Sequence, residues 1–247
     1  MIIALAGKGG TGKTTICALF VKFLKELKKQ PILVIDADPN ANLNELLGVK
    51  VEKTIGQIRE EMLHDKGERI AGMSKEEMFE YKINEVLIEE NGFDLIVMGR
   101  PEGPGCYCYV NHLLRRYLEI LSRQYKFIII DNEAGLEHLS RRTASNIDIL
   151  LIISEAYPRS IRTINRIKEL VKELNLKIKK SYVILNKVTD EESIEIIRET
   201  FKEEVLGYIP EDPEISKFDM EGKSFFNLPS TSVAYKKAKL IFSKIIN

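Results

Sequence analysis

The sequence predicts a single-domain, doubly wound α/β fold with a mostly parallel sheet of about seven or eight strands flanked by helices. Two observations lead to this prediction. Short runs rich in Ile, Val and Leu alternate with longer amphipathic stretches along the 247 residues, and the short runs lack the polar alternation of half-exposed strands. No internal repeat, low-complexity tract or Pro/Gly/Ser-rich linker interrupts this pattern, so we expect one domain over residues 1–247.

The expected strands and helices follow one another in alternation. We expect strands at Ile2–Ala6, Ile32–Asp36, Phe93–Met98, Phe127–Asp131, Ile149–Ile153, Tyr182–Leu185 and Val205–Tyr208. We expect helices at Lys13–Lys29, Asn111–Arg123, Ile161–Leu174, Glu191–Lys202 and Ser232–Ile246. The charge-rich segment 49–90 is expected to be mostly helical and to resemble an insertion over the core. Its charged runs would form a solvated helix face or a docking surface for a partner.

Composition narrows the classes of partner. The 37 basic and 37 acidic residues balance, which favours neither nucleic acid nor an anionic membrane as a stable partner. The apolar start Met1–Ala6 is too short for a signal peptide, and no stretch reaches the roughly eighteen apolar residues needed to span a bilayer. Three cysteines, an odd number, do not indicate a disulfide framework in a reducing compartment. We therefore expect a cytoplasmic protein.

The first candidate site is a glycine-rich loop. Residues 7–14 read Gly-Lys-Gly-Gly-Thr-Gly-Lys-Thr, which fits the P-loop pattern between an expected strand and an expected helix. Backbone N–H groups would face nucleotide phosphates, with help from the helix dipole. We expect Lys13 to reach the β- and γ-phosphates and Thr14 to bind Mg²⁺. The other phosphate-binding residues are expected to be Gly9, Gly10, Thr11, Gly12 and Thr15.

Two further strands end in carboxylates. The strand Phe127–Asp131 closes on Asp131, which is expected to contact Mg²⁺ through water, as in a Walker B motif. The strand Ile32–Asp36 leads into Asp36-Ala37-Asp38-Pro39-Asn40, which places carboxylates beside the loop. Turn capping is an alternative role for Asn40, and a less favoured one for Asp38.

The loop Gly-Lys-Gly-Gly-Thr-Gly-Lys-Thr-Thr resembles the deviant Walker A motif of the MinD/ParA/nitrogenase-iron-protein superfamily. The resemblance implies a homodimer in which Lys8 reaches the partner's nucleotide. It also implies that Asp38 orients or deprotonates the attacking water, and that Gly135 belongs to a loop that senses the γ-phosphate. The superfamily more often has Thr-Pro where this chain has Asn132-Glu133.

Two segments after strands occupy places where relatives hold adenine. These segments contain Asn186, Lys187, Pro210, Glu211 and Asp212. The guanine-specific pattern N-K-x-D is incomplete because residue 189 is Thr. The sequence therefore favours ATP or ADP over guanine nucleotides.

Cys106 and Cys108 stand one residue apart in a loop rich in Gly and Pro, after the strand Phe93–Met98. One chain would supply two thiolates, and a two-fold dimer would supply four. Thiolates suit Zn²⁺, Cu(I) or iron–sulfur clusters, and can hold Ni²⁺. The alternative is that both are small buried residues, as we expect for Cys17.

The run Gly-Arg-Pro-Glu-Gly-Pro-Gly-Cys-Tyr-Cys at residues 99–108, with Asn-His-Leu-Leu-Arg at 111–115, resembles the CooC family. Those proteins are nickel-insertion ATPases that mature carbon monoxide dehydrogenase. The resemblance implies that Cys106 and Cys108 of both subunits bind one Ni²⁺ or Zn²⁺ ion, with carbon monoxide dehydrogenase or another nickel enzyme as client. Two alternatives stay open: a MinD/ParA-like positioning ATPase, and an iron–sulfur scaffold or reductase resembling nitrogenase iron protein.

Overall fold

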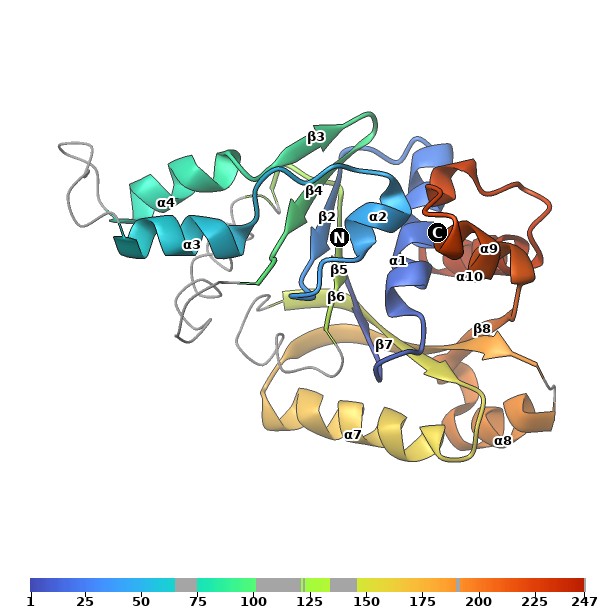
Figure 1. The fold of residues 1–247 in the computed structure, drawn as a ribbon. Coiled ribbons are helices and arrows are strands. Elements are labelled where there is room, and N and C mark those ends of the chain that lie inside the picture. The colour runs from blue at the N-terminus through green and yellow to red at the C-terminus, as the bar shows by residue number, and fades with distance from the viewer. Residues whose placement is uncertain (65–74, 101–120, 122, 134–145, 190–191, 247) are drawn as a thin grey trace.

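A sheet of eight strands forms the centre of the computed structural model, which describes residues 1–64, 75–100, 121, 123–133, 146–189 and 192–246 (Figure 1). The strands are β1 (Ile2–Ala6), β2 (Ile32–Asp36), β3 (Ile88–Glu90), β4 (Phe93–Val97), β5 (Phe127–Asp131), β6 (Asn146–Glu155), β7 (Lys177–Val188) and β8 (Val205–Pro210). Their order is β3-β4-β2-β5-β1-β6-β7-β8, and every neighbouring pair is parallel except β3 with β4. The predicted α/β fold class is confirmed.

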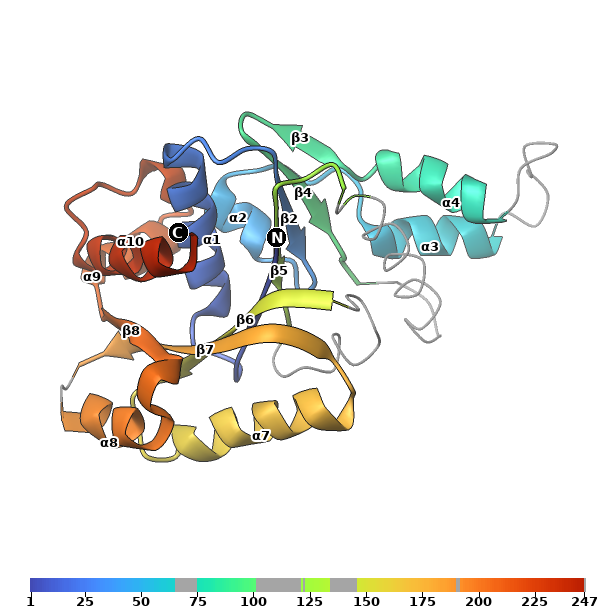
Figure 2. The ribbon, with the colours of Figure 1, turned by 180° about the vertical axis from the view of Figure 1, so that it is seen from behind.

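Helices pack on both faces of the sheet, as Figures 1 and 2 show from opposite sides. They are α1 (Lys13–Glu26), α2 (Leu43–Leu47), α3 (Ile55–His64), α4 (Lys75–Asn84), α7 (Ser160–Glu173), α8 (Glu192–Phe201), α9 (Pro213–Met220) and α10 (Val233–Ile246). Short 3₁₀ turns follow at Lys202–Glu204 and Phe225–Asn227.

Two hydrophobic layers explain why the strands lack polar alternation. Alternate residues of each strand enter opposite layers: in β1, Ala4 and Ala6 join one layer, whereas Ile3 and Leu5 join the other. The first layer includes buried residues of α3, α4, α7 and α8, and the second includes those of α1, α2 and α10. A central strand must therefore be apolar on both faces.

The structure departs from the expected elements in several places. β3 is an additional antiparallel edge strand, and α2 and α9 are additional short helices. β6 and β7 are longer than expected, whereas α1 and β4 end slightly earlier. Segment 49–90 contains α3, α4 and β3, and its residues Val49, Ile55, Ile58, Ile83 and Val86 are buried. That segment therefore also builds the core. The expected helix Asn111–Arg123 falls mostly outside the described residues.

The last helix, α10, packs its apolar side onto the molecule. Ala234, Tyr235, Ala238, Ile241, Phe242 and Ile245 are buried. The ring centroid of Phe242 lies 4.5 Å from that of Phe20 on α1. Within the described ranges, none of the helices has the length and apolarity that crossing a bilayer requires.

Candidate nucleotide-binding site

The glycine-rich loop joins β1 to α1 at the carboxyl edge of the sheet. Gly12 adopts a left-handed conformation, with φ of 85°, immediately before α1 begins at Lys13. The carbonyl oxygen of Lys8 accepts hydrogen bonds from the Thr11 hydroxyl at 2.9 Å and from Nζ of Lys13 at 3.3 Å. The strand–loop–helix context predicted for a P-loop is therefore present, and hydrogen bonds within the loop hold its conformation.

Gly7 and Gly12 are required by close contacts. A Cβ atom on Gly7 would lie 2.3 Å from the carbonyl oxygen of Ile153 on β6. A Cβ atom on Gly12 would lie 2.4 Å from Nδ2 of Asn186, at the end of β7. The loop is thus held closely against the ends of the two strands that follow β1 in the sheet.

The two lysines of the loop lie in different environments. Lys13 is only 7% exposed, and burial lowers the pKa of its ammonium group. The carboxylates of Asp131, Asp38 and Glu133 act in the opposite direction on that pKa, which places all three near the Lys13 charge. Lys8, in contrast, is exposed. An exposed cation at this point is free to meet a group from outside the chain.

Asp131 and Asp36 form a pair of buried carboxyl groups. Their Cα positions are direct register partners at the ends of β5 and β2, and they are 1% and 0% exposed. The pKa of each is raised to about 7, mainly by burial and, for Asp131, also by the charge of the neighbouring Asp36. Oδ1 and Oδ2 of Asp36 accept backbone N–H bonds from Asp38 and Leu43, both at 3.1 Å.

Asp131 lacks comparable partners. Among the described residues, neither of its carboxylate oxygens makes a hydrogen bond of normal geometry. The Thr14 side chain and the Lys13 charge nevertheless lie near enough to lower its pKa against the effect of burial. Buried acceptors without donors are rare in folded proteins. The carboxylate oxygens of Asp131 are therefore available to bind a ligand.

Asp36 was not assigned a role from sequence, although the Asp36-Ala37-Asp38 run placed a carboxylate at the strand end. The missing information was its register opposite Asp131, which depends on the packing of β2 against β5. Asp38 lies at the edge of the same cluster, and its Oδ1 accepts hydrogen bonds from the backbone N and side-chain Nδ2 of Asn40. The capping acceptor in this turn is therefore the Asp38 carboxylate, the role that we favoured less for Asp38, and Asn40 supplies the donors.

The end of β7 clamps the loop from the side. Nδ2 of Asn186 donates to the carbonyl oxygen of Thr11 at 2.9 Å, and Nζ of Lys187 donates to that of Gly10 at 2.8 Å. Asn186 is 5% exposed, and Lys187 is exposed with a positive φ of 55°. These two residues, expected from sequence at the adenine, contact the phosphate loop itself.

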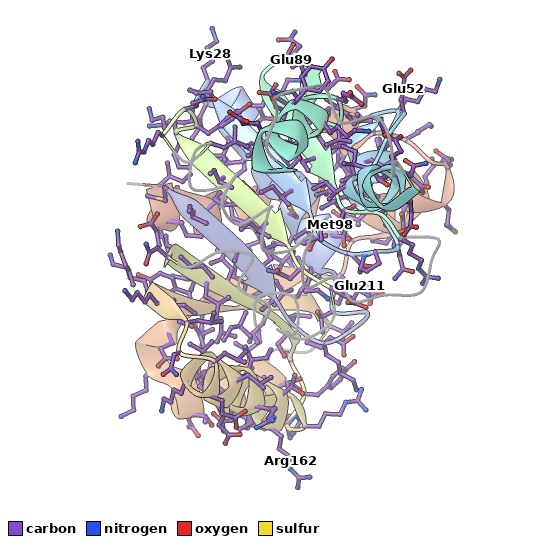
Figure 3. The ribbon with its side chains drawn as sticks, turned by 90° about the vertical axis from the view of Figure 1, so that its left-hand side faces the viewer. Lys28, Glu52, Glu89, Met98, Arg162 and Glu211 are labelled. Atoms are coloured by element: carbon purple, nitrogen blue, oxygen red, sulfur yellow. The ribbon has the colours of Figure 1, made fainter. Side chains whose placement is uncertain are left out.

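Residues at the end of β8 also hold neighbouring elements together. Pro210 closes β8, and the backbone N of Glu211 donates to the Val188 carbonyl oxygen at 3.1 Å. Figure 3 labels Glu211 and also Met98, which follows β4. Asp212 caps α9 by accepting from Glu214 N, and its other oxygen accepts from the Ser232 hydroxyl and Ala234 N. Its side chain therefore joins α9 to the start of α10, and its contact with adenine stays a prediction.

The donor set fits Mg²⁺ bound with a nucleotide. Mg²⁺ prefers oxygen ligands, keeps several waters and usually takes one or two protein carboxylates together with phosphate oxygens. Thr14 at the start of α1 and Asp131 at the end of β5 provide such oxygens. In the described ranges no group of three or more His, Cys, Asp or Glu residues is arranged to hold a metal ion. Nucleotide phosphates and water would thus complete the shell.

Three other predicted residues, Cys106, Cys108 and Gly135, lie outside the described residues.

Two further residues singled out in the sequence are buried beside the site. Cys17 is buried, and burial raises the pKa of its thiol well above the ordinary value, as expected for a packed core residue. Asn132, where the superfamily more often has Thr, is 2% exposed and donates from Nδ2 to the Leu5 carbonyl oxygen at 2.7 Å. It ties the end of β5 to β1.

Comparison with known sequences identifies relatives over the whole length. An uncharacterised ATP-binding protein of Methanocaldococcus jannaschii is 48% identical over 252 aligned residues, covering 100% of this chain and 99% of that protein. The carbon monoxide dehydrogenase accessory protein CooC of Rhodospirillum rubrum is 31% identical, covering 92% of this chain and 90% of CooC.

Solved structures share the fold. The MinD cell division protein of Aquifex aeolicus matches with a TM-score of 0.72 at 22% identity, covering 99% of this chain and 96% of that one. MinD of Pyrococcus horikoshii, solved as a complex with Mg-ADP, matches with a TM-score of 0.71 at 23% identity, covering 100% of this chain and 96% of that one. The model of the CobQ/CobB/MinD/ParA nucleotide-binding domain matches residues 2–225. The chain therefore belongs to the CobQ/CobB/MinD/ParA family of nucleotide-binding domains.

Proposed function

We propose that this protein is a Mg²⁺-dependent ATPase that works as a homodimer and delivers nickel or zinc to a client enzyme. The ATPase assignment is carried by one observation: Lys13, at the start of α1, lies near the buried Asp131 at the end of β5, whose carboxylate has no hydrogen bond of normal geometry within the described residues. A buried cation beside a buried carboxylate is the charge arrangement that a metal-bound polyphosphate would complete.

We assign each residue of the site a separate role in ATP hydrolysis. Loop N–H groups and Lys13 would hold the β- and γ-phosphates, and Thr14 and Asp131 would hold a hydrated Mg²⁺, which would supply positive charge beside the phosphate oxygens. Asp38 orients a water molecule and accepts its proton. The water oxygen forms a bond to the γ-phosphorus while the bond to the bridging oxygen breaks, which releases ADP and phosphate.

Lys8 supports the homodimer. Its side chain is exposed while its carbonyl oxygen is held by Thr11 and Lys13, so the backbone is fixed and the ammonium group faces outward. In a two-fold dimer each subunit would offer this charge to the nucleotide of the other. Nucleotide binding would then favour association, because the phosphates screen two otherwise repelling lysines.

The metal-delivery assignment rests on the sequence. The C-x-C pair Cys106 and Cys108 gives four thiolates in a two-fold dimer, a complete tetrahedral set. CooC, which is 31% identical over most of this chain, is an accessory protein of carbon monoxide dehydrogenase. We propose that enzyme or another nickel enzyme as client, with ATP binding reshaping the thiolate site and hydrolysis releasing the ion.

A positioning ATPase of the MinD/ParA type is the second candidate, favoured by the match to MinD structures. Such a role would need a membrane or DNA surface. On α10, Lys236, Lys237 and Lys244 lie beside the exposed Leu240. The apolar side of α10 is nevertheless packed against α1 and β8, so this helix has little apolar surface left to bind lipid. Co-sedimentation with liposomes or DNA tests that alternative.

The decisive experiment is an anaerobic titration of Ni²⁺ and Zn²⁺ into the full chain, with ADP or ATP, combined with light scattering. One ion per two chains, lost when Cys106 and Cys108 are both changed to Ala, supports metal delivery. Binding that ignores both cysteines contradicts it. Lys13→Ala is the matched control for the nucleotide site and should abolish ATP hydrolysis; unchanged hydrolysis would contradict the ATPase assignment.

A further inference from the structure

The carboxylate of Asp38 is linked to a residue from a different strand. Oδ1 of Asp38 accepts the backbone N–H of Asn40 at 2.8 Å and its side-chain Nδ2 at 2.9 Å. Oδ1 of Asn40 in turn accepts a hydrogen bond from the guanidinium group of Arg100 at 2.5 Å. The Asn40 amide therefore uses its donor end on Asp38 and its acceptor end on Arg100, which fixes the orientation of the amide.

The backbone that carries Arg100 is anchored on two sides. The backbone N of Met98 donates to the Asp36 carbonyl oxygen at 2.9 Å, and the Met98 carbonyl oxygen accepts from Gly56 N at 2.8 Å. Gly99 has a φ of 63°, and a Cβ there would lie 2.5 Å from the Thr54 hydroxyl oxygen. Arg100 thus leaves the end of β4 from a position set by β2 and by the start of α3.

We propose that Asn40 and Arg100 are positioning residues that hold Asp38 in the orientation needed for hydrolysis, an inference that rests on the ATPase function proposed above. Both Asn40 bonds go to Oδ1 of Asp38, which leaves Oδ2 as the oxygen that meets the attacking water. Without the Arg100 bond the Asn40 amide can rotate, and Asp38 then samples other rotamers. A misplaced general base slows the chemical step and leaves phosphate binding unaffected.

The surroundings make Arg100 suitable for substitution. Arg100 and Asn40 are exposed, and a cavity of about 390 Å³ lies beside them, lined also by Pro39, Thr54 and Gln57. Substitutions there change a hydrogen bond and leave the buried layers intact. The variants should therefore fold with the melting temperature of the unmodified protein.

The experiment measures kcat, KM and the affinity for a non-hydrolysable ATP analogue in the full-length protein. Arg100→Gln and Asn40→Ala should each lower kcat about three- to tenfold, the net effect of one solvent-exposed hydrogen bond, with analogue affinity unchanged. The double variant should lose no more than the worse single variant, because both changes break the same link. Arg100→Lys, which keeps a charged donor, should recover part of kcat.

Arg162→Gln is the matched control, because it removes the same charge from α7, where Arg162 projects away from the rest of the molecule (Figure 3). It should leave kcat unchanged. Additive losses in the double variant, or an Arg100→Gln enzyme with normal kcat, would overturn the positioning role while leaving the ATPase assignment intact. An unmodified protein that neither binds nor hydrolyses ATP would instead overturn the proposed function itself.

Discussion

Asp36 and Asp131 face the same helix, α1, from paired positions on neighbouring strands, and both carboxyl groups are buried. The pKa of each is raised to about 7, first by burial and, for Asp131, also by the charge of Asp36. The unfolded chain ionises both near their ordinary pKa of 3.8. The nucleotide-free protein therefore carries a cost of ionisation that a cation would relieve.

The sign of the resulting pH dependence can be worked out. Because the pKa is higher in the folded state, the folded protein keeps protons between about pH 4 and pH 7 that the unfolded chain releases. The free energy of unfolding thus falls as pH rises through this window. Asp131→Asn removes one charge without losing a hydrogen bond of normal geometry within the described residues. It should stabilise the nucleotide-free protein by about 1–3 kcal/mol at pH 8 and by much less at pH 5.

Urea unfolding at the two pH values tests this prediction, and ATP hydrolysis by the same variant should fall by at least about 100-fold. Asp148→Asn is a control of opposite sign. The pKa of Asp148 is lowered, because hydrogen bonds from Lys179 and Ile2 N outweigh partial burial, so its loss should destabilise at pH 8. A destabilised Asp131→Asn variant at pH 8 would contradict the prediction.

Asn186 and Lys187 allow the clamp on the phosphate loop to be measured. Both donate to loop carbonyl oxygens, but Asn186 is buried and Lys187 is exposed. A buried hydrogen bond is costlier to lose than one exposed to solvent. Asn186→Ala should weaken Mg-ADP binding about tenfold, and Lys187→Ala no more than about threefold, by titration calorimetry. Equal losses would show that burial does not decide the strength of the clamp.

Local patterns carried much of the fold prediction. The strand Ile2–Ala6, the loop and the helix beginning at Lys13 could be predicted because their chemistry is contained in adjacent residues. β3 was missed because Glu89 and Glu90 make a three-residue edge strand look like a turn. The first half of β7 was missed because Lys177, Lys179 and Lys180 interrupt its apolar run. Pairing defines both strands: β3 pairs with β4, the next strand along the chain, and β7 pairs with β6, which lies before α7.

The candidate site likewise contains residues that local motifs predict and residues that they do not. Lys13, Thr14 and Asp131 follow from motifs, and the structure brings them together. The roles of Asp36 and of the Asn186 clamp depend on register between strands that are far apart in sequence. No spacing rule within one segment contains that information.

Asp212 should act on stability as well as on any base contact. Although burial opposes ionisation, hydrogen bonds from Ser232, Ala234 N and Glu214 N lower its pKa. A lowered pKa means that the stabilisation is present at neutral pH and is lost as pH falls through the folded-state value. Asp212→Ala should cost about 1–3 kcal/mol at pH 7 and less at pH 3, measured by urea unfolding. Glu211→Ala, an exposed neighbour, is the control and should cost much less.

Arg100 offers a test of communication between nucleotide and metal. It contacts Asn40 beside Asp38, and it immediately precedes the segment that contains Cys106 and Cys108. If ATP binding moves Asp38 and Asn40, the change reaches the cysteine segment through this bond. A non-hydrolysable ATP analogue should then change the affinity for Ni²⁺ in the unmodified protein by about 5- to 100-fold, and Ni²⁺ should change analogue affinity by the same factor.

Arg100→Gln should bring that factor close to one while leaving both cysteines in place, whereas Arg162→Gln should preserve it. Competition titrations with a chromophoric chelator, run anaerobically with and without the analogue, give both affinities. An Arg100→Gln protein with full coupling would show that the nucleotide signal reaches the cysteines by another route. Because coupling is reciprocal, a change seen in only one of the two titrations would point to an artefact of metal competition, and the factor must then be measured again with a different chelator.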